Sequence, residues 1–186
     1  KFDLRVKGVT SMSVDIHKYG YAPKGGSCVV YSNPEIRRSG YTTVTDWSGG
    51  LYRTHAMGGS RGGHIMAATW ATLLNMGING YDHEARVVHA TYKKILNGVK
   101  SMPGLKIMGT PSLSIVAFTS DEFDIYKVAD VMKHIGSWEM ARMQRPPCVH
   151  ICINVRTASV VDQWLLDLQK SVDMCQGTES QGIDGM

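Results

Sequence analysis

The first third of the chain carries short runs in which apolar and polar residues alternate, the pattern of strands with one exposed face. Strands are predicted at residues 11–16, 27–32 and 42–45. Asn33 is placed to cap one helical turn at residues 34–38, because Pro34 suits the first helical position. Strands joined by such short connections favour antiparallel pairing, here at the edge of a larger sheet.

The middle of the chain changes to a helical pattern. Residues 49–63 are rich in Gly, Ser, Thr and Arg and predict a loop. The helix expected at residues 64–76 is apolar on most sides, so we expect it to be buried. After a break at residues 77–80, a second helix is predicted at residues 81–100. Its apolar residues recur three and four apart and form one stripe, made of Ala85, Val88, Tyr92, Leu96 and Val99.

The clearest boundary is the sequence Met-Pro-Gly at residues 102–104. Beyond it, strands are predicted at residues 105–108, 114–118 and 149–155, and helices at residues 125–135, capped by Asp124, and 158–173. This alternation indicates a small α+β unit. We therefore expect residues 1–101 to hold part of a large domain and its linking helix, residues 102–175 a small C-terminal domain, and residues 176–186 a flexible tail.

Composition narrows the class of protein. Hydrophobic residues make up 43% and charged residues 19% of the 186, which indicates a globular chain with a large interior. The net charge of +4 is scattered along the chain, which argues against nucleic-acid binding and is compatible with an anionic substrate or cofactor. No apolar run is long enough to span a membrane. The chain has neither an initiating methionine nor a signal peptide, so we expect it to be part of a longer enzyme.

The four cysteines form no Cys-x-x-Cys pair. Cys148, His150 and Cys152 alternate on a predicted strand, but a zinc site would need a fourth ligand. We therefore expect no metal, and buried free thiols in a reducing compartment.

Two lysines, Lys18 and Lys24, lie between the first two predicted strands in a stretch rich in Tyr and Gly. A lysine held between strands is partly desolvated, which lowers its pKa and frees the amine to form a Schiff base. Asp15 is expected on the same strand face as His17, where it would fix the imidazole tautomer or cap the turn. On these residues alone, a solvated turn lysine remains an open alternative.

The second candidate is the Gly-rich segment at residues 58–63, which leads into the predicted helix. Unpaired backbone N–H groups and the helix dipole favour an anion at such a place, and Ser60 and Arg61 add a hydroxyl and a guanidinium. A plain flexible loop is the alternative.

The stretch DIHKYGYAPKG at residues 15–25 resembles the cofactor-lysine segment of the sphingosine-1-phosphate lyases, relatives of the group II decarboxylases among fold-type I pyridoxal-phosphate enzymes. The resemblance covers residues 9–172, with further motifs TDWSGGLY at residues 45–52, GGSRGG at residues 58–63, FDIY at residues 123–126 and PPCVHICI at residues 146–153. The resemblance implies an α/β fold, that of the pyridoxal-phosphate-dependent transferases that resemble aspartate aminotransferase. The chain would hold part of its large domain and the small C-terminal α+β domain.

The resemblance also implies roles for individual residues. Lys18 is expected to be the Schiff-base lysine that holds pyridoxal 5'-phosphate, and His17 to contact the cofactor phosphate. Lys24 is expected at the substrate phosphate. Tyr52 is expected at the mouth of the site, in a catalytic and substrate-positioning role.

In the Gly-rich segment, the resemblance implies that Gly59 and Ser60 bind the cofactor phosphate and that Arg61 binds substrate. The family brings this segment across a homodimer interface, so each site would be composite. This chain has Gly62 where the family has proline, which predicts a less rigid loop.

The activity implied is carbon–carbon cleavage of a phosphorylated sphingoid base to a long-chain aldehyde and phosphoethanolamine, without nucleic-acid or metal partners. Two alternatives stay open: an amino-acid decarboxylase of the same fold, and an inactive dimerisation fragment. The isolated chain is expected to be inactive, because the residues that stack on the cofactor and pair with its pyridine nitrogen belong to the other half of the family's fold. The expected location is the cytosolic face of the endoplasmic reticulum membrane in a eukaryote, through an anchor outside this chain, and the cytoplasm in a bacterium.

Overall fold

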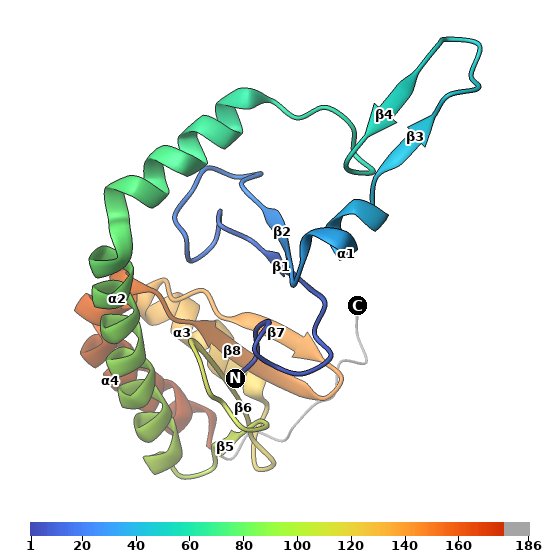
Figure 1. Ribbon diagram of the computed structural model, residues 1–186. Helices are drawn as coiled ribbons and strands as arrows, with labels where there is room; N and C mark the ends of the chain where they lie inside the picture. The colour runs from blue at the N-terminus through green and yellow to red at the C-terminus, as the bar shows by residue number, and fades with distance from the viewer. Residues whose placement is uncertain (177–186) are drawn as a thin grey trace. The chain divides into compact units, whose positions relative to one another are not determined.

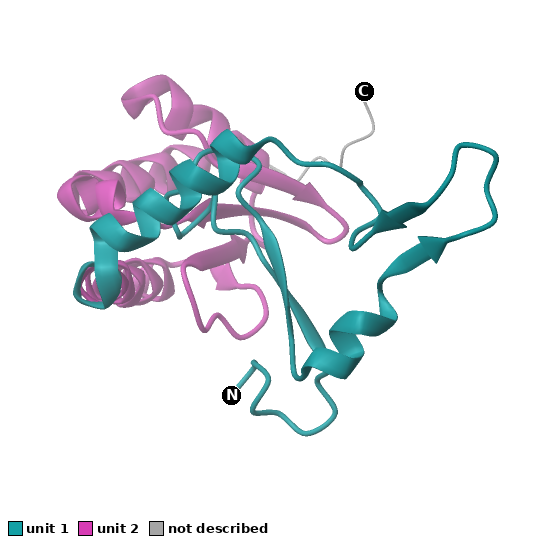
Figure 2. Cartoon of the chain, turned by 45° about the horizontal axis from the view of Figure 1, so that its top comes forward, with its two compact units in different colours: residues 1–81 teal, residues 82–186 magenta. Residues whose placement is uncertain are grey.

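The computed structural model describes residues 1–176, and the chain forms two compact units, Lys1–Tyr81 and Asp82–Met186 (Figures 1 and 2). Apart from Gln176, the predicted flexible tail lies outside the described residues. The domain boundary predicted at residue 101 stays a prediction. None of the described helices is both long and apolar enough to cross a membrane.

Two small antiparallel ribbons and a short helix make up most of unit 1. Strands β1 (Ser11–Val14) and β2 (Cys28–Tyr31) pair with Ser11 opposite Tyr31, which confirms the predicted strands and their antiparallel pairing. Helix α1 (Pro34–Ser39) follows, and the Asn33 side chain accepts a hydrogen bond from the Ile36 amide at 2.9 Å, as the predicted cap requires.

The second ribbon joins β3 (Thr42–Val44) to β4 (Tyr52–Thr54) and extends beyond α1 (Figure 1). The predicted loop at residues 49–63 is therefore wrong at β4. The Gly, Ser, Thr and Arg residues around β4 favour a loop, and the strand forms because it pairs with β3.

Helix α2 (Gly63–Ser101) runs from unit 1 into unit 2 and is kinked at Gly77, whose φ of 58° and ψ of 179° suit glycine. Its first half was expected to be buried, and this is wrong: Met66, Trp70 and Leu74 are exposed. The physical reason is that the connection between β1 and β2 covers only one side of this half, around Ile65 and Thr69. The apolar residues of the helix lie on several sides, so some of them stay exposed.

Unit 2 is a four-stranded antiparallel sheet with helices packed on its core. The sheet order is β5-β6-β8-β7, formed by β5 (Lys106–Ile107), β6 (Ile115–Thr119), β7 (Ala141–Gln144) and β8 (Pro147–Cys152). Helices α3 (Ile125–Gly136) and α4 (Val155–Cys175) pack against each other. Phe118 of β6 meets Trp164 of α4 edge to face, and with Ile95 of α2 they lie in one buried core.

Strand β7 was not predicted, and its residues are all exposed. The Asp124 cap of α3 is confirmed, since its side chain accepts from the Tyr126 amide. Helix α4 begins three residues earlier than predicted, because Asn154 and Thr157 form a reciprocal capping box.

None of the four cysteines forms a disulfide in the described chain, and only Cys148 and Cys175 are buried. Cys28 and Cys152 are exposed, so the expectation of buried thiols is wrong for these two.

Candidate active site

The connection between β1 and β2, which carries Lys18, is held in one conformation by hydrogen bonds. The His17 amide donates to the Gly26 carbonyl at 2.8 Å, and the Ala22 amide donates to the Ile16 carbonyl at 3.2 Å. From α2, the Tyr81 hydroxyl donates to the Gly20 carbonyl at 2.7 Å. These bonds tie the connection to itself and to α2, so the backbone that carries Lys18 is held in place.

Glycines let the same connection approach α2 closely. A Cβ on Gly26 would lie 2.6 Å from Thr69 Oγ1, and a Cβ on Gly25 would lie 3.4 Å from Ile65. The φ of 98° at Gly25 also requires glycine. The Lys18 connection therefore rests on the first half of α2, the helix that the Gly-rich segment enters.

His17 points its Nδ1 at the Gly26 carbonyl oxygen, 3.0 Å away. A carbonyl only accepts, so Nδ1 carries the proton and Nε2 is the nitrogen left for another partner. The expectation that Asp15 orients this ring is wrong. The Asp15 carboxylate accepts from Ser27 Oγ at 2.8 Å and pairs with Lys18 instead.

Lys18 forms an ion pair with Asp15, with Nζ and Oδ2 2.8 Å apart, and its side chain is 65% exposed. The hydrogen bond to the carboxylate raises the pKa of Lys18 and lowers that of Asp15. The expected lowering of the Lys18 pKa by desolvation is therefore wrong for this chain. The connection constrains the backbone, but leaves the ammonium in water beside an acid.

The Gly-rich segment leads directly into α2. Gly59 has a φ of 64°, which glycine adopts readily, and the Arg61 guanidinium lies over Gly58, where a Cβ would come within 2.6 Å of Nη2. A Cβ on Gly62 would lie 2.7 Å from the His64 ring, so glycine at this position leaves room for that ring. Ser60 and Arg61 are both exposed.

Tyr52 lies on β4, where its ring meets Trp47 edge to face at 6.0 Å between centroids. Lys24 is exposed on the same connection as His17 and Lys18. Within the described residues, no hydrogen bond or ion pair joins Tyr52, Ser60 or Arg61 to Lys18. His17, Lys18 and Lys24 thus share one connection, Gly59, Ser60 and Arg61 share the segment before α2, and Tyr52 lies on its own ribbon.

These residues fit pyridoxal phosphate chemically. A lysine on a fixed backbone offers an amine for the cofactor aldehyde, and His17 has one ring nitrogen to spare. The segment before α2 offers backbone N–H groups, a hydroxyl and a guanidinium for a phosphate. Sequence reasoning missed Tyr81 as an anchor, because it lies far along the chain. It also missed the Asp15–Lys18 pair, although a spacing of three residues allows such a pair.

Comparison with known proteins identifies relatives of one kind. No family model matches the chain. It is 44% identical over 172 residues to sphingosine-1-phosphate lyase of Oryza sativa, covering 92% of this chain and 32% of the relative. It is 40% identical over 187 residues to sphingosine-1-phosphate lyase 1 of Rattus norvegicus, covering 100% of this chain and 33% of the relative.

The solved sphingosine-1-phosphate lyase of Burkholderia pseudomallei superimposes with a TM-score of 0.87 at 39% identity, over 94% of this chain and 40% of that one. This chain is a homologue of the sphingosine-1-phosphate lyases. It spans about a third of the length of these curated relatives. Glutamate decarboxylase of Lactobacillus brevis, with a TM-score of 0.75 at 17% identity over 97% of this chain and 44% of that chain, shares the fold alone. The predicted fold class, α/β of the fold-type I pyridoxal-phosphate enzymes, is confirmed.

Proposed function

We propose that this chain is the lysine-bearing part of a pyridoxal-phosphate-dependent lyase that cleaves a phosphorylated sphingoid base to a long-chain aldehyde and phosphoethanolamine. The observation that carries the proposal is the match to the Burkholderia pseudomallei lyase, which covers 94% of this chain at 39% identity. When bound, the cofactor supplies the electron sink for carbon–carbon cleavage. The protein supplies attachment, orientation and charge.

Lys18 holds the cofactor through its amine in this proposal. The amine must lose its proton before it reacts, and the adjacent Asp15 opposes that loss because it stabilises the ammonium. His17 contributes Nε2, since its Nδ1 is engaged by the Gly26 carbonyl. Both side chains belong to a connection fixed by backbone hydrogen bonds, so their spacing is set before any ligand binds.

The other candidate residues are proposed to bind the phosphate groups of the cofactor and the substrate or to position the substrate. Gly59 and Ser60 serve the cofactor phosphate in the segment before α2. The Gly59 amide donates to the Ala56 carbonyl at 3.1 Å, so the Ser60 amide and hydroxyl are the proposed donors. Lys24 and Arg61 serve the substrate phosphate, and Tyr52 positions substrate at the mouth of the site. Because no bond joins these residues to Lys18 within the described chain, we propose that a second copy completes each site. The isolated chain is then expected to attach the cofactor without turning over substrate.

The attachment is tested by incubating the chain with pyridoxal phosphate, reducing it with borohydride and locating the cofactor by peptide mass spectrometry. We expect the adduct on the Lys18 peptide, and its loss in Lys18→Arg. Lys24→Arg is the matched control, because Lys24 lies on the same connection and is also exposed. Equal labelling of both lysines, or of Lys18→Arg and wild type, would contradict the assignment.

The reaction is tested in the dimer of the full-length natural protein that contains this chain. Release of a long-chain aldehyde from sphingosine 1-phosphate supports the lyase. Carbon dioxide from an amino acid without any aldehyde would support the decarboxylase alternative instead.

A further inference from the structure

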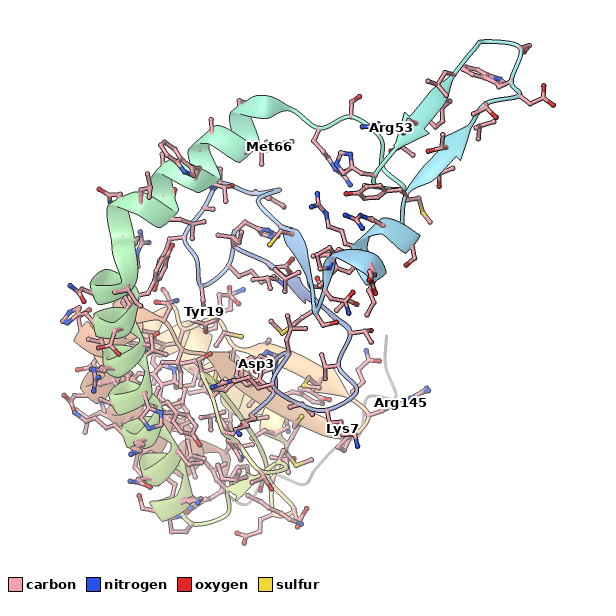
Figure 3. The ribbon with its side chains drawn as sticks, viewed as in Figure 1. Asp3, Lys7, Tyr19, Arg53, Met66 and Arg145 are labelled. Carbon is pink, nitrogen blue, oxygen red and sulfur yellow. The ribbon has the colours of Figure 1, made fainter. Side chains whose placement is uncertain are left out.

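A second group of polar residues gathers away from the Lys18 connection, on the ribbon formed by β3 and β4. The register places Thr43 opposite Arg53 and Thr42 opposite Thr54, and continued by one residue it places Tyr41 opposite His55. Side chains alternate between the two faces of a ribbon, and residues in opposite positions share a face. Tyr41, Arg53 and His55 therefore lie on the same face (Arg53 is labelled in Figure 3).

Helix α1 adds a second guanidinium to this face. Arg37 lies in the last turn of α1, and its guanidinium carbon is 5.8 Å from the centre of the Tyr41 ring, a cation–π distance. The chain between them is held by hydrogen bonds from the Gly40 amide to the Arg37 carbonyl and from the Tyr41 amide to the Arg38 carbonyl. The hydrogen bonds of the turn after α1 thus fix the position of Arg37 beside the ribbon.

These residues line a pocket that is half open to solvent. Its volume is about 340 Å³, and it is lined by Arg37, Tyr41, Arg53, Thr54 and His55. The hydrogen of the Thr54 hydroxyl is engaged by the Ala56 carbonyl at 2.7 Å, which shapes the turn after β4. The lining therefore presents two guanidinium groups, an imidazole and a phenol, and no carboxylate.

The two arginines are free to bind an external anion. In unit 1, Arg5 pairs with Asp3 and Lys18 pairs with Asp15. Neither Arg37 nor Arg53 has a carboxylate within ion-pair distance among the described residues. Two unpaired guanidinium groups at one pocket repel each other, and an anion between them would remove that cost and accept their N–H groups in pairs.

We propose that this pocket binds a phosphate monoester, separately from the Lys18 site. Guanidinium forks match the geometry of a phosphate, and the phenol and imidazole supply further donors. The pocket is at the lower end of the range of about 300–1,000 Å³ typical of small-molecule sites, which is larger than a bare phosphate requires. The ligand class is therefore a phosphate ester with a small attached group. The proposal does not depend on the function proposed for Lys18.

The test is a titration of the ¹⁵N-labelled chain with glycerol 3-phosphate, followed by NMR. We expect saturable shifts of the amides of residues 37–41 and 53–55, with a Kd on the order of 1 mM, because two charged hydrogen-bonding groups bind a solvated anion weakly. Arg37→Gln and Arg53→Gln should each weaken binding about tenfold, and Arg53→Lys, which keeps the charge but loses the fork, should weaken it less.

Arg38→Gln is the matched control, because Arg38 is adjacent to Arg37 on α1 and does not line the pocket. It should bind as wild type does. Arg37 also supports the turn through Tyr41, so the fold of each variant is checked by circular dichroism, and Arg53→Gln tests the site without touching that contact. Absence of saturable shifts in wild type, or an equal loss in Arg38→Gln, would overturn the proposal.

A phosphate monoester can be a free metabolite or a lipid headgroup, so a second arm separates the two. The chain is sedimented with phosphatidylcholine vesicles that contain or lack phosphatidic acid. Co-sedimentation that requires phosphatidic acid and is lost in Arg53→Gln identifies a headgroup. Binding of glycerol 3-phosphate without co-sedimentation identifies a free ester, and either result supports the site. Vesicle binding that persists unchanged in both Gln variants counts against it.

Discussion

Asp15 controls the charge state of Lys18, three residues along the same connection. The carboxylate is 2.8 Å from the ammonium and also accepts a hydrogen bond from Ser27. This arrangement keeps Lys18 protonated to a higher pH than an isolated lysine, because the hydrogen bond and the charge both favour the ammonium. A reactive amine at this position therefore needs a change at Asp15 or a competing partner for it.

The first prediction concerns Asp15→Asn. Removing the negative charge should lower the pKa of Lys18 toward the ordinary lysine value, so more amine is present at any pH below that value. The chain should then be labelled faster by pyridoxal phosphate and borohydride at mildly alkaline pH. An NMR titration of the Lys18 ε-methylene group measures the pKa directly.

Asp3→Asn is the control for this prediction, because Asp3 pairs with Arg5 and not with Lys18. It should leave the Lys18 titration unchanged. A Lys18 pKa that does not fall in Asp15→Asn would show that the ion pair does not set its charge in solution.

The identities of the residues alone could not predict the direction in which the pKa of Lys18 shifts. Lys18 was predicted to be constrained, and its connection is indeed fixed by hydrogen bonds. Its pKa was predicted in the wrong direction, because burial and pairing act oppositely on a lysine. Which of the two dominates depends on where Asp15 and the surrounding chain lie, and that is a property of the fold.

At the scale of elements, Asp167 of α4 links that helix to the segment after α3. Its buried carboxylate accepts from the Trp138 indole at 3.0 Å and from the Gln163 amide at 2.9 Å. The Trp138 hydrogen bond, with a lesser contribution from Gln163, lowers the pKa of Asp167 below its ordinary value of 3.8. A group with a lowered folded pKa stabilises the fold above its ordinary pKa and loses that effect as pH falls through the folded value.

We therefore expect Asp167→Asn to lower the free energy of unfolding of unit 2 by about 1–3 kcal/mol at neutral pH, where a charged hydrogen-bond acceptor is lost. The difference from wild type should shrink as the pH falls below 3.8, because the unfolded chain then binds a proton at this carboxyl that the folded chain takes up only at a lower pH. Urea unfolding followed by circular dichroism at a series of pH values measures both effects.

Asp173→Asn is the matched control on the same helix, since Asp173 is exposed and accepts one hydrogen bond from Gln169. It should change the free energy of unfolding little at any pH. A wild-type advantage over Asp167→Asn that stays constant down to about pH 3 would contradict the linkage.

Elements with local signals were predictable, and elements that depend on partners were not. Asn33 and Asp124 cap their helices through bonds to amides two or three residues away, which the sequence displays directly. Strands β4 and β7 are short and mostly exposed, and they form because β3 and β8 pair with them. Such pairing depends on residues outside the strand, so the pattern of the strand alone does not show it.

At the scale of the whole molecule, the chain spans about a third of the length of its curated relatives. The first half of α2 illustrates the consequence for sequence reasoning. Its apolar composition predicts burial, yet Trp70 is 64% exposed in this chain. A hydrophobic pattern indicates that a helix face is stabilised by burial. It does not specify which segment packs against that face.

The last prediction follows from this surface. Met66, Trp70 and Leu74 recur four apart along one side of α2 and are all exposed, so they form a contiguous apolar strip. The chain should bind the dye ANS in its native state, and Trp70→Lys should reduce the fluorescence severalfold without loss of helix content. Leu166→Lys is the matched control, because Leu166 is 58% exposed on α4. Its effect should be small, since single exposed apolar residues bind the dye weakly. Equal reductions in the two variants would show that the dye reports a general property of the chain and not the α2 strip.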